Sequence, residues 1–421
     1  MAKTHLTIEG EKFLINEKVT YSEIDGTRPG VHGLLMNARF IQGIFDDAMA
    51  PDRFARWGHR EWDAMANTDR LIAALPEWYR YGLRAFTTGF QGGGPCFTAP
   101  NHTIQNNPFG EDGLNLDADY AERMDKLIRG ADAVGMIVIV SFFYGSQTRW
   151  LKDEKAIRNA VTTASRFVKE YPNVIIEVAN EMNIGAFANH SIIQEPEGMV
   201  TLLNLAQKES GGLPCGCSGG GGYRNREVAE ASDVILIHGN GCTRQRYHNM
   251  IREVQSWNLN RPIVCNEDSQ AIGQLQVAYK TQTSWGYYNN MTKQEPPADW
   301  GITTGEDTFF AHRMAEGIGI DTDLIDDQYY LQGLEPHWTY QGQRWLRLAS
   351  LYPETISYVD FYRNGKFYDT AYDEPFSLHF QTNWRQGGID VRDDDREWKA
   401  VIHCGDGQVI ELGMNVGFST F

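Results

Sequence analysis

The stretch Val174-Ile-Ile-Glu-Val-Ala-Asn-Glu-Met-Asn183 combines an apolar run with an abrupt polar ending. Its first three residues are β-branched, which favours a parallel strand that is buried on both faces. Asn180 and Glu181 then end the run with two polar side chains. In a (β/α)8 barrel the carboxyl ends of the strands carry the chemistry, so this ending predicts a functional site in a cleft.

A second stretch repeats this design further along the chain. Pro262-Ile-Val-Cys-Asn-Glu267-Asp268 is another apolar strand that ends in carboxylates. Two glutamates at two strand ends of one barrel predict the two-carboxylate site of a glycosidase.

The length and charge of the chain bound the remaining possibilities. A chain of 421 residues suits one large barrel followed by a smaller module. The net charge of −17 argues against nucleic acid and anionic membrane as partners, since both bind clustered Lys and Arg. No apolar run is long enough to span a bilayer. The N-terminus lacks an apolar signal core, so we expect a cytoplasmic protein, or an exported one whose leader was removed.

Eight strand–helix units follow one another over about 300 residues, as a (β/α)8 barrel requires. The expected strands are 33–45, 82–90, 136–143, 174–181, 213–218, 234–237, 262–267 and 284–290. The expected helices are 61–80, 117–134, 154–171, 197–209, 244–257, one between the last two strands, and 305–318. A hairpin within 6–21 is expected to close the bottom of the barrel, and Gly219–Gly222 to form a flexible loop over the cleft.

The residue pattern changes from strand–helix units to short alternating segments after about residue 334, so the expected domains are 1–334 and 335–421. Alternating apolar and polar residues flank the turn Asn364-Gly365, and similar alternation appears in 376–380 and 398–403. This predicts a small all-β domain, an immunoglobulin-like sandwich packed on the barrel. Asp393-Asp394-Asp395 is interpreted as an acidic hairpin tip and not as a calcium site, which needs oxygens from spaced residues.

The cysteines form no regular framework, and we expect reduced thiols, several of them buried. They are Cys96, Cys215, Cys217, Cys242, Cys265 and Cys404.

Cleavage of a glycosidic bond needs a proton donor for the leaving oxygen. The retaining mechanism adds a nucleophilic carboxylate about 5 Å from that donor. One carboxyl must hold its proton near neutrality while the other is ionised, so their surroundings must differ. Asn180 and Asn266, each directly before a glutamate, are well placed as donors. A strand-end glutamate can also be a metal ligand or a salt-bridge partner, and both alternatives stay open.

Ala179-Asn180-Glu181 on the fourth strand and Pro262-x-x-x-x-Glu267 on the seventh resemble the clan-A glycoside hydrolases, the group that contains the cellulase-like enzymes. The resemblance covers about residues 10–320. It implies that Glu181 is the general acid/base and Glu267 the nucleophile. It also implies that Asn180 hydrogen-bonds the sugar 2-hydroxyl.

Some positions depart from the clan pattern. His238 falls where the clan often carries a His or Tyr that orients the nucleophile. The platform tryptophan of the eighth strand has two counterparts here, Trp285 and Tyr288. The second-strand arginine is missing from Phe86-Thr87-Thr88, and Arg39 on the first strand is its expected substitute. These departures indicate an outlying family.

Further polar residues at expected strand ends are candidates for substrate subsites: Asp46, Gln91, Tyr144 and Asn240. The sequence therefore predicts a retaining β-glycosidase or endo-glycanase that binds carbohydrate and needs neither metal nor cofactor. One alternative is a metal-dependent barrel hydrolase or lyase, which would need a His-rich ligand set. The other is a barrel that binds carbohydrate without cleaving it.

Overall fold

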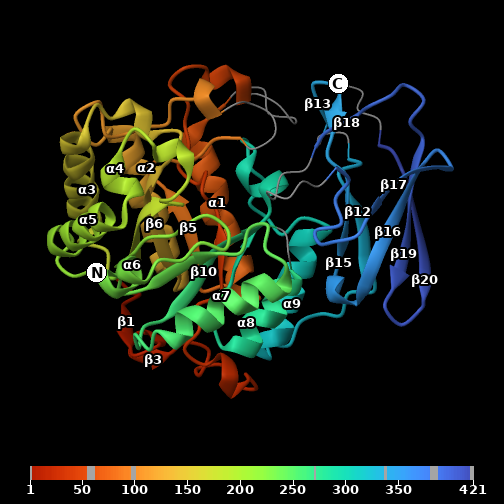
Figure 1. Cartoon of the computed structure of the whole chain (residues 1–421), viewed down its shortest axis with the longest axis horizontal. Coiled ribbons are helices and arrows are strands. Elements are labelled where there is room, and N and C mark those ends of the chain that lie inside the picture. The colour runs from red at the N-terminus through yellow and green to blue at the C-terminus, as the bar shows by residue number, and fades with distance from the viewer. Residues whose placement is uncertain are drawn as a thin grey trace.

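The computed structural model of the chain describes residues 2–54, 62–95, 101–269, 272–335, 339–379 and 387–417. Eight parallel strands form one sheet in the order β8-β7-β6-β5-β4-β11-β10-β9. The sheet closes between its two ends, where Asp233 N donates to the Cys215 carbonyl at 2.8 Å. Figure 1 shows this barrel on one side of the molecule and a smaller all-β part on the other, so the expected fold class is confirmed.

The barrel strands and their helices alternate along the chain. The strands are β4 (Asn37–Arg39), β5 (Ala85–Gly89), β6 (Ile137–Tyr144), β7 (Val174–Asn180), β8 (Cys215–Gly216), β9 (Ile235–His238), β10 (Ile263–Ser269) and β11 (Gly286–Tyr288). The helices are α1 (Ala64–Arg80), α2 (Ala118–Val134), α3 (Glu154–Val168), α4 (Ser191–Gln194), α5 (Pro196–Glu209), α6 (Arg226–Ala231), α7 (Arg244–Ser256), α8 (Gly273–Thr281) and α9 (Glu306–Ile318).

Side-chain caps define several of these helix starts. Asp63, Asp117 and Asp153 accept backbone N–H groups at the first turns of α1, α2 and α3. At the other end of α2, Gly135 takes φ 96°, a left-handed conformation that favours glycine. The cap and the stop that the sequence predicts for the helix at 117–134 are therefore both confirmed.

The bottom of the barrel is closed by the N-terminal strands β1 (Leu6–Glu9), β2 (Lys12–Ile15) and β3 (Lys18–Val19). Leu6 and Phe13 pack against apolar side chains of the barrel interior such as Ile139, Ile175 and Val264. The hairpin thus closes the bottom of the barrel as expected, and the carboxyl ends of the strands form the polar end of the barrel.

Three barrel strands are much shorter than the sequence indicates. The strand expected over 33–45 pairs only as Asn37–Arg39, because the chain turns at Phe40 and Gly43 N donates to the Phe40 carbonyl. A Cβ added at Gly43 would lie 2.8 Å from atoms of Leu71 and Thr88, so only glycine lets this turn pack against the helix layer. The fifth and eighth strands likewise shorten to two and three residues.

The C-terminal part consists of antiparallel sheets. The larger one has the order β17-β16-β19-β20, from β16 (Ile356–Arg363), β17 (Lys366–Ala371), β19 (Glu397–Cys404) and β20 (Val409–Asn415). The others pair β12 (Tyr329–Gln332) with β15 (Arg347–Ser350), and β13 (Thr339–Tyr340) with β14 (Gln343–Arg344) and β18 (Ile389–Asp390). Side chains of both β12–β15 and the larger sheet form a second core that includes Leu331, Phe361 and Trp398.

Within this β domain the turn at Asn364-Gly365 is confirmed, with φ 50° and 76° at its two residues. The strand expected over 376–380 is wrong, because Phe376 and His379 both have positive φ and only Ser377 makes an isolated bridge. Phe380 lies outside the described residues. The immunoglobulin-like topology stays a prediction, and so does the boundary at residue 334.

The β domain packs on the barrel through charged and polar groups. Arg313 of α9 donates to the Leu351 carbonyl at 2.6 Å and pairs with Glu354 at 2.8 Å. Glu374 of the β domain accepts from Gly273 N at the start of α8, at 3.2 Å. Figure 1 shows β12 and β15 as the strands nearest to the barrel.

Asp395, in the acidic tip of the β domain, is buried and pairs with both Arg363 Nε and Arg363 NH2. We expect Asp395→Ala to lower the free energy of unfolding of the β domain by about 3–5 kcal/mol, because it leaves a buried guanidinium without its partner. Urea unfolding followed by fluorescence measures this. Asp393→Ala, at an exposed position of the same tip, is the control, and equal effects of the two substitutions would contradict the assignment.

The described cysteines are free. Cys215, Cys217, Cys242 and Cys265 are buried, and Cys404 is partly exposed, while Cys96 lies outside the described residues. Within the described ranges, no helix is both long and apolar enough to cross a membrane.

Candidate active site

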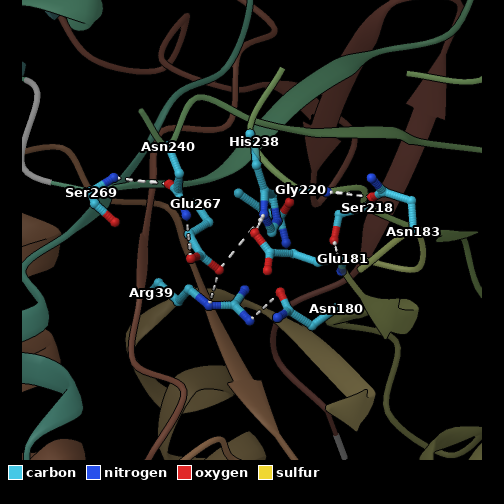
Figure 2. Close-up of polar contacts among 12 residues, drawn as sticks. Arg39, Asn180, Glu181, Asn183, Ser218, Gly220, His238, Asn240, Glu267 and Ser269 are labelled. Carbon is cyan, nitrogen blue, oxygen red and sulfur yellow. Dashed lines mark hydrogen bonds and ion pairs between the residues drawn. The ribbon is translucent and has the colours of Figure 1, made fainter. Parts of the chain in front are cut away.

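The fourth and seventh barrel strands bring two glutamates together at the upper end of the barrel. Glu181 directly follows β7, and Glu267 lies within β10. Single ligand atoms of Glu181, Glu267 and the β9 residue His238 all lie within 4.8 Å of one another. Figure 2 shows the three side chains pointing toward a common centre from their three strands. These oxygens are nearer to each other than the roughly 6.5–9.5 Å that separates the two carboxyl groups of inverting glycosidases.

Both oxygens of Glu267 face hydrogen-bond donors. Arg39 Nε lies 2.7 Å from Oε2, and Asn240 Nδ2 donates to Oε1 at 2.6 Å. Arg39 also donates through NH2 to Asn180 Oδ1 at 2.7 Å, so one guanidinium joins the ends of β4, β7 and β10 (Figure 2). A carboxylate whose two oxygens both accept hydrogen bonds is stabilised in its ionised form. This environment suits a nucleophile.

Glu181 has a different environment. Its φ is 57°, a left-handed conformation that is costly for a residue other than glycine. Ser218 holds this conformation, because its Oγ accepts from Glu181 N at 3.1 Å and its carbonyl accepts from Met182 N at 3.0 Å. The strained residue turns the chain out of β7, and the carboxyl points toward His238 and Glu267.

His238 lies between the two carboxyls and is fully buried. Its Nδ1 lies 3.2 Å from Glu181 Oε1 and 3.8 Å from Glu267 Oε2. Among the described residues, it is the hydrogen-bond partner of the Glu181 carboxyl. The imidazole can therefore exchange a proton with Glu181.

Burial and charge act against each other on these groups. Burial raises the pKa of Glu267 above its usual value, with a contribution from the nearby Glu181 charge, although Arg39, His238 and Asn240 lower it. At Glu181 burial also raises the pKa, but the hydrogen bond and charge of His238 outweigh it and lower the pKa below its usual value. The two carboxylates raise the pKa of His238 against the effect of burial. The three groups thus share protons as one coupled system.

The lowered pKa of Glu181 and the raised pKa of His238 favour a proton on the imidazole, whereas a general acid must hold a proton. Glu267 is held by two donors, and Glu181 lies 3.2 Å from a protonated imidazole that can supply its proton.

The glycine run Gly219–Gly222 forms an ordered turn beside Glu181. Gly220 N donates to Asn183 Oδ1 at 2.8 Å, and Gly222 N donates to the His238 carbonyl at 3.0 Å. A Cβ added at Gly221 would overlap the Asn240 carbonyl, so glycine is required for this close approach. The expected flexible loop is therefore wrong: hydrogen bonds and tight packing fix it as a wall of the site.

Two aromatic side chains lie near Arg39. The guanidinium carbon is 5.8 Å from the centre of the Tyr288 ring. Burial lowers the pKa of Arg39, but Glu267 and Glu177 raise it above its usual value, with smaller contributions from Tyr288 and Tyr144. Tyr288 is buried, and its contact with a sugar stays a prediction.

Two other expected subsite residues, Gln91 and Asp46, make hydrogen bonds within the loops after β5 and β4. Gln91 is buried, and its amide accepts from Tyr144 N at 3.1 Å and donates to Asn107 at 2.8 Å, so it shapes the loop after β5. Asp46 accepts from Trp62 Nε1 at 3.0 Å within the loop after β4. These contacts give both residues structural roles and leave their contact with substrate a prediction.

Trp285 requires a correction. Its side chain is fully buried, its Nε1 donates to Asp268 at 2.9 Å, and its ring packs against Phe310 of α9. Side chains alternate along a strand, so Trp285 and Tyr287 face the helix layer while Tyr288 faces the site. The expected role of Trp285 as a sugar platform is therefore wrong.

Sequence reasoning missed a third carboxylate. Glu177 lies within β7, is fully buried, and accepts from Ser218 Oγ at 2.6 Å and from Asn266 Nδ2 at 2.8 Å. The available signal was its position: a charged residue in the middle of an apolar strand is costly unless it is paired.

Glu181, His238 and Glu267 also present three atoms that a cation could bind. Arg39 disfavours this, because its positive charge already lies 2.7 Å from Glu267 Oε2.

Part of the chain matches the model of a known protein family. Residues 62–194 match the family model Cellulase (glycosyl hydrolase family 5). The search of curated proteins found no match. Among solved structures, a "putative glycoside hydrolase" from Bacteroides vulgatus has a TM-score of 0.50 at 10% identity, covering 98% of this chain and 83% of that one. This likeness supports the fold.

Two further solved structures are more distant. The endo-beta-1,4-mannanase of Thermotoga petrophila has a TM-score of 0.46 at 10% identity, covering 96% of this chain and 100% of that one. Beta-glucuronidase 2 of Bacteroides uniformis has a TM-score of 0.46 at 9% identity, covering 99% of this chain. The chain spans only 48% of the length of that glucuronidase.

Proposed function

We propose that this chain, a clan-A glycoside hydrolase by its barrel and its family match, cleaves β-glycosidic bonds of an oligo- or polysaccharide by double displacement. The observation that carries the proposal is the carboxylate pair. Oxygens of Glu181 and Glu267 lie within 4.8 Å of each other at the ends of the fourth and seventh strands. This spacing leaves no room for a water between Glu267 and the sugar, as inversion would need, and it supports retention.

In the first step Glu181 donates its proton to the glycosidic oxygen as the bond to the anomeric carbon breaks. Glu267 attacks that carbon from the opposite face and forms a covalent glycosyl ester. Arg39 and Asn240 keep Glu267 oriented and ionised until the attack. Asn180 accepts from Arg39 through Oδ1, so its Nδ2 is directed to the sugar 2-hydroxyl.

In the second step a water replaces the leaving group. Glu181, now ionised, removes a proton from this water while the water oxygen attacks the anomeric carbon, and Glu267 leaves as a carboxylate. His238, 3.2 Å from Glu181, buffers the proton that Glu181 loses and regains. Two inversions at one carbon give net retention.

The test is hydrolysis of a panel of aryl β-glycosides and unmodified β-glycans, with the first-formed anomer followed by NMR. We expect at least one substrate to be cleaved and the β-anomer to appear first. An α-anomer as the first product would contradict retention. Inactivity toward the whole panel, with the fold intact, would favour a barrel that only binds carbohydrate.

The metal-dependent alternative is tested by the same assay. We propose that hydrolysis needs no metal, because Arg39 supplies the positive charge beside Glu267. Activity that is lost on treatment with a chelator and returns with one divalent cation would overturn this.

A further inference from the structure

Glu177 lies one layer below the carboxylate pair and makes contact with both sides of the site. Its Oε1 accepts from Asn266 Nδ2, and Asn266 directly precedes Glu267. The pairing of β10 with β9 is irregular between Cys265 and Glu267, at the position of Asn266. Glu177 therefore holds the side chain of Asn266. Asn266 lies at the register shift of β10, and this shift sets the direction of the Glu267 side chain.

The other oxygen of Glu177 faces Arg39. Oε2 lies 3.7 Å from Arg39 Nη1, at ion-pair distance, and both atoms are buried without a hydrogen-bond partner among the described residues. The three nitrogens of this guanidinium thus face three different groups: Nε faces Glu267, Nη2 faces Asn180, and Nη1 faces Glu177. Arg39 shares its single positive charge between two carboxylates.

We propose that Glu177 is a positioning residue that sets the basicity of the nucleophile through Arg39; this inference rests on the proposed function of Glu267. If Arg39 faced Glu267 alone, its whole charge would neutralise that carboxylate and weaken it as a nucleophile. A second carboxylate on the far side of the guanidinium draws part of this charge away and repels the charge of Glu267. The reactivity of Glu267 is thereby preserved.

Other groups around Glu177 are consistent with a charged residue. Its Oε1 lies 3.9 Å from His238 Nε2 and accepts from Ser218 Oγ. Burial raises the pKa of the Cys217 thiol, and the Glu177 charge raises it further, so the thiol is neutral. Arg39 and His238 are thus the cationic groups that face Glu177, and Glu181 and Glu267 are the anionic ones above them.

The test is the pH dependence of kcat/KM for an activated aryl glycoside in Glu177→Gln. This variant keeps the shape and an acceptor for Ser218 and Asn266 but removes the charge. The acidic limb of the profile reports the ionisation of the nucleophile in the free enzyme. We expect this limb to move to lower pH by about one unit, as loss of a like charge at this range predicts. We also expect kcat/KM on the plateau to fall, by at most about tenfold, because reactivity follows basicity.

Ser218→Ala is the control, since it removes the hydrogen bonds of Ser218 Oγ with Glu177 and with Glu181 N but removes no charge. Its acidic limb should stay in place even where its activity falls. A Glu177→Gln enzyme whose activity falls while its acidic limb stays at the wild-type position would show a merely structural role and overturn the inference.

A second variant tests the inference if Glu177→Gln does not fold. Glu177→Asp withdraws the charge from Arg39 by one methylene and should move the limb in the same direction by less. An unmoved limb in that variant would equally overturn the inference. If the wild type hydrolyses no glycoside, or if Glu267 is dispensable, the proposed function itself has failed, whatever Glu177 does.

Discussion

Replacing Glu267 by alanine is expected to lower kcat for β-glycosides by at least about 10⁴-fold, because the covalent step loses its nucleophile. The substitution opens a small space lined by the two donors that held the carboxylate, Arg39 Nε and Asn240 Nδ2. A small anion fits such donors. Azide should therefore restore turnover of activated aryl glycosides by attacking from the face that Glu267 occupied, and the product should be the α-glycosyl azide.

The matched control for this experiment is Asp268→Asn. Asp268 is the next residue of β10 and is also buried, but it accepts from Trp285 on the helix side of the strand. Burial raises its pKa well above the usual value, so the neutral amide is a close substitute. This variant should keep its activity, and azide should not change its turnover. Full activity of Glu267→Ala would refute the nucleophile assignment.

The sequence predicts the barrel well because its main signal is local. Runs such as Val174–Ile176 and Ile137–Val140 are continuously apolar, as strands buried on both faces require. Strand lengths are less predictable. The turn after Arg39 depends on Gly43 fitting between Leu71 and Thr88, and such a contact between distant residues leaves no periodic signal.

The site residues also fall into those that a local sequence pattern predicts and those that depend on contacts between distant residues. Glu181 and Glu267 are visible because polar residues end apolar strands, but their contacts depend on neighbours from other strands. Trp285, directly before β11, shows the limit of prediction from the sequence. Neighbouring side chains alternate between the helix side and the site side, so a shift of one residue reverses the assignment. Glu177 shows the converse: its charge is explained only by Arg39, Ser218 and Asn266, which lie far from it in the sequence.

Replacing Glu181 by alanine is expected to separate substrates by their leaving groups. Glycosides with poor leaving groups, such as unmodified oligosaccharides, need the proton and should lose roughly 10²–10⁴-fold in kcat/KM. Dinitrophenolate leaves without protonation, so dinitrophenyl glycosides should keep most of their kcat/KM. The water of the second step also loses its base, so the glycosyl ester should accumulate and give a burst of phenolate.

Azide distinguishes the two roles within one assay. In Glu181→Ala it should accelerate breakdown of the ester, because an anionic nucleophile needs no base and the negative charge of Glu181 is gone. It attacks the face opposite to Glu267, so the product should be the β-glycosyl azide, the opposite anomer to that from Glu267→Ala. Equal losses for good and poor leaving groups, with no burst, would contradict the acid/base role of Glu181. The same anomer from both variants would show that the two carboxylates do not act on opposite faces of the sugar.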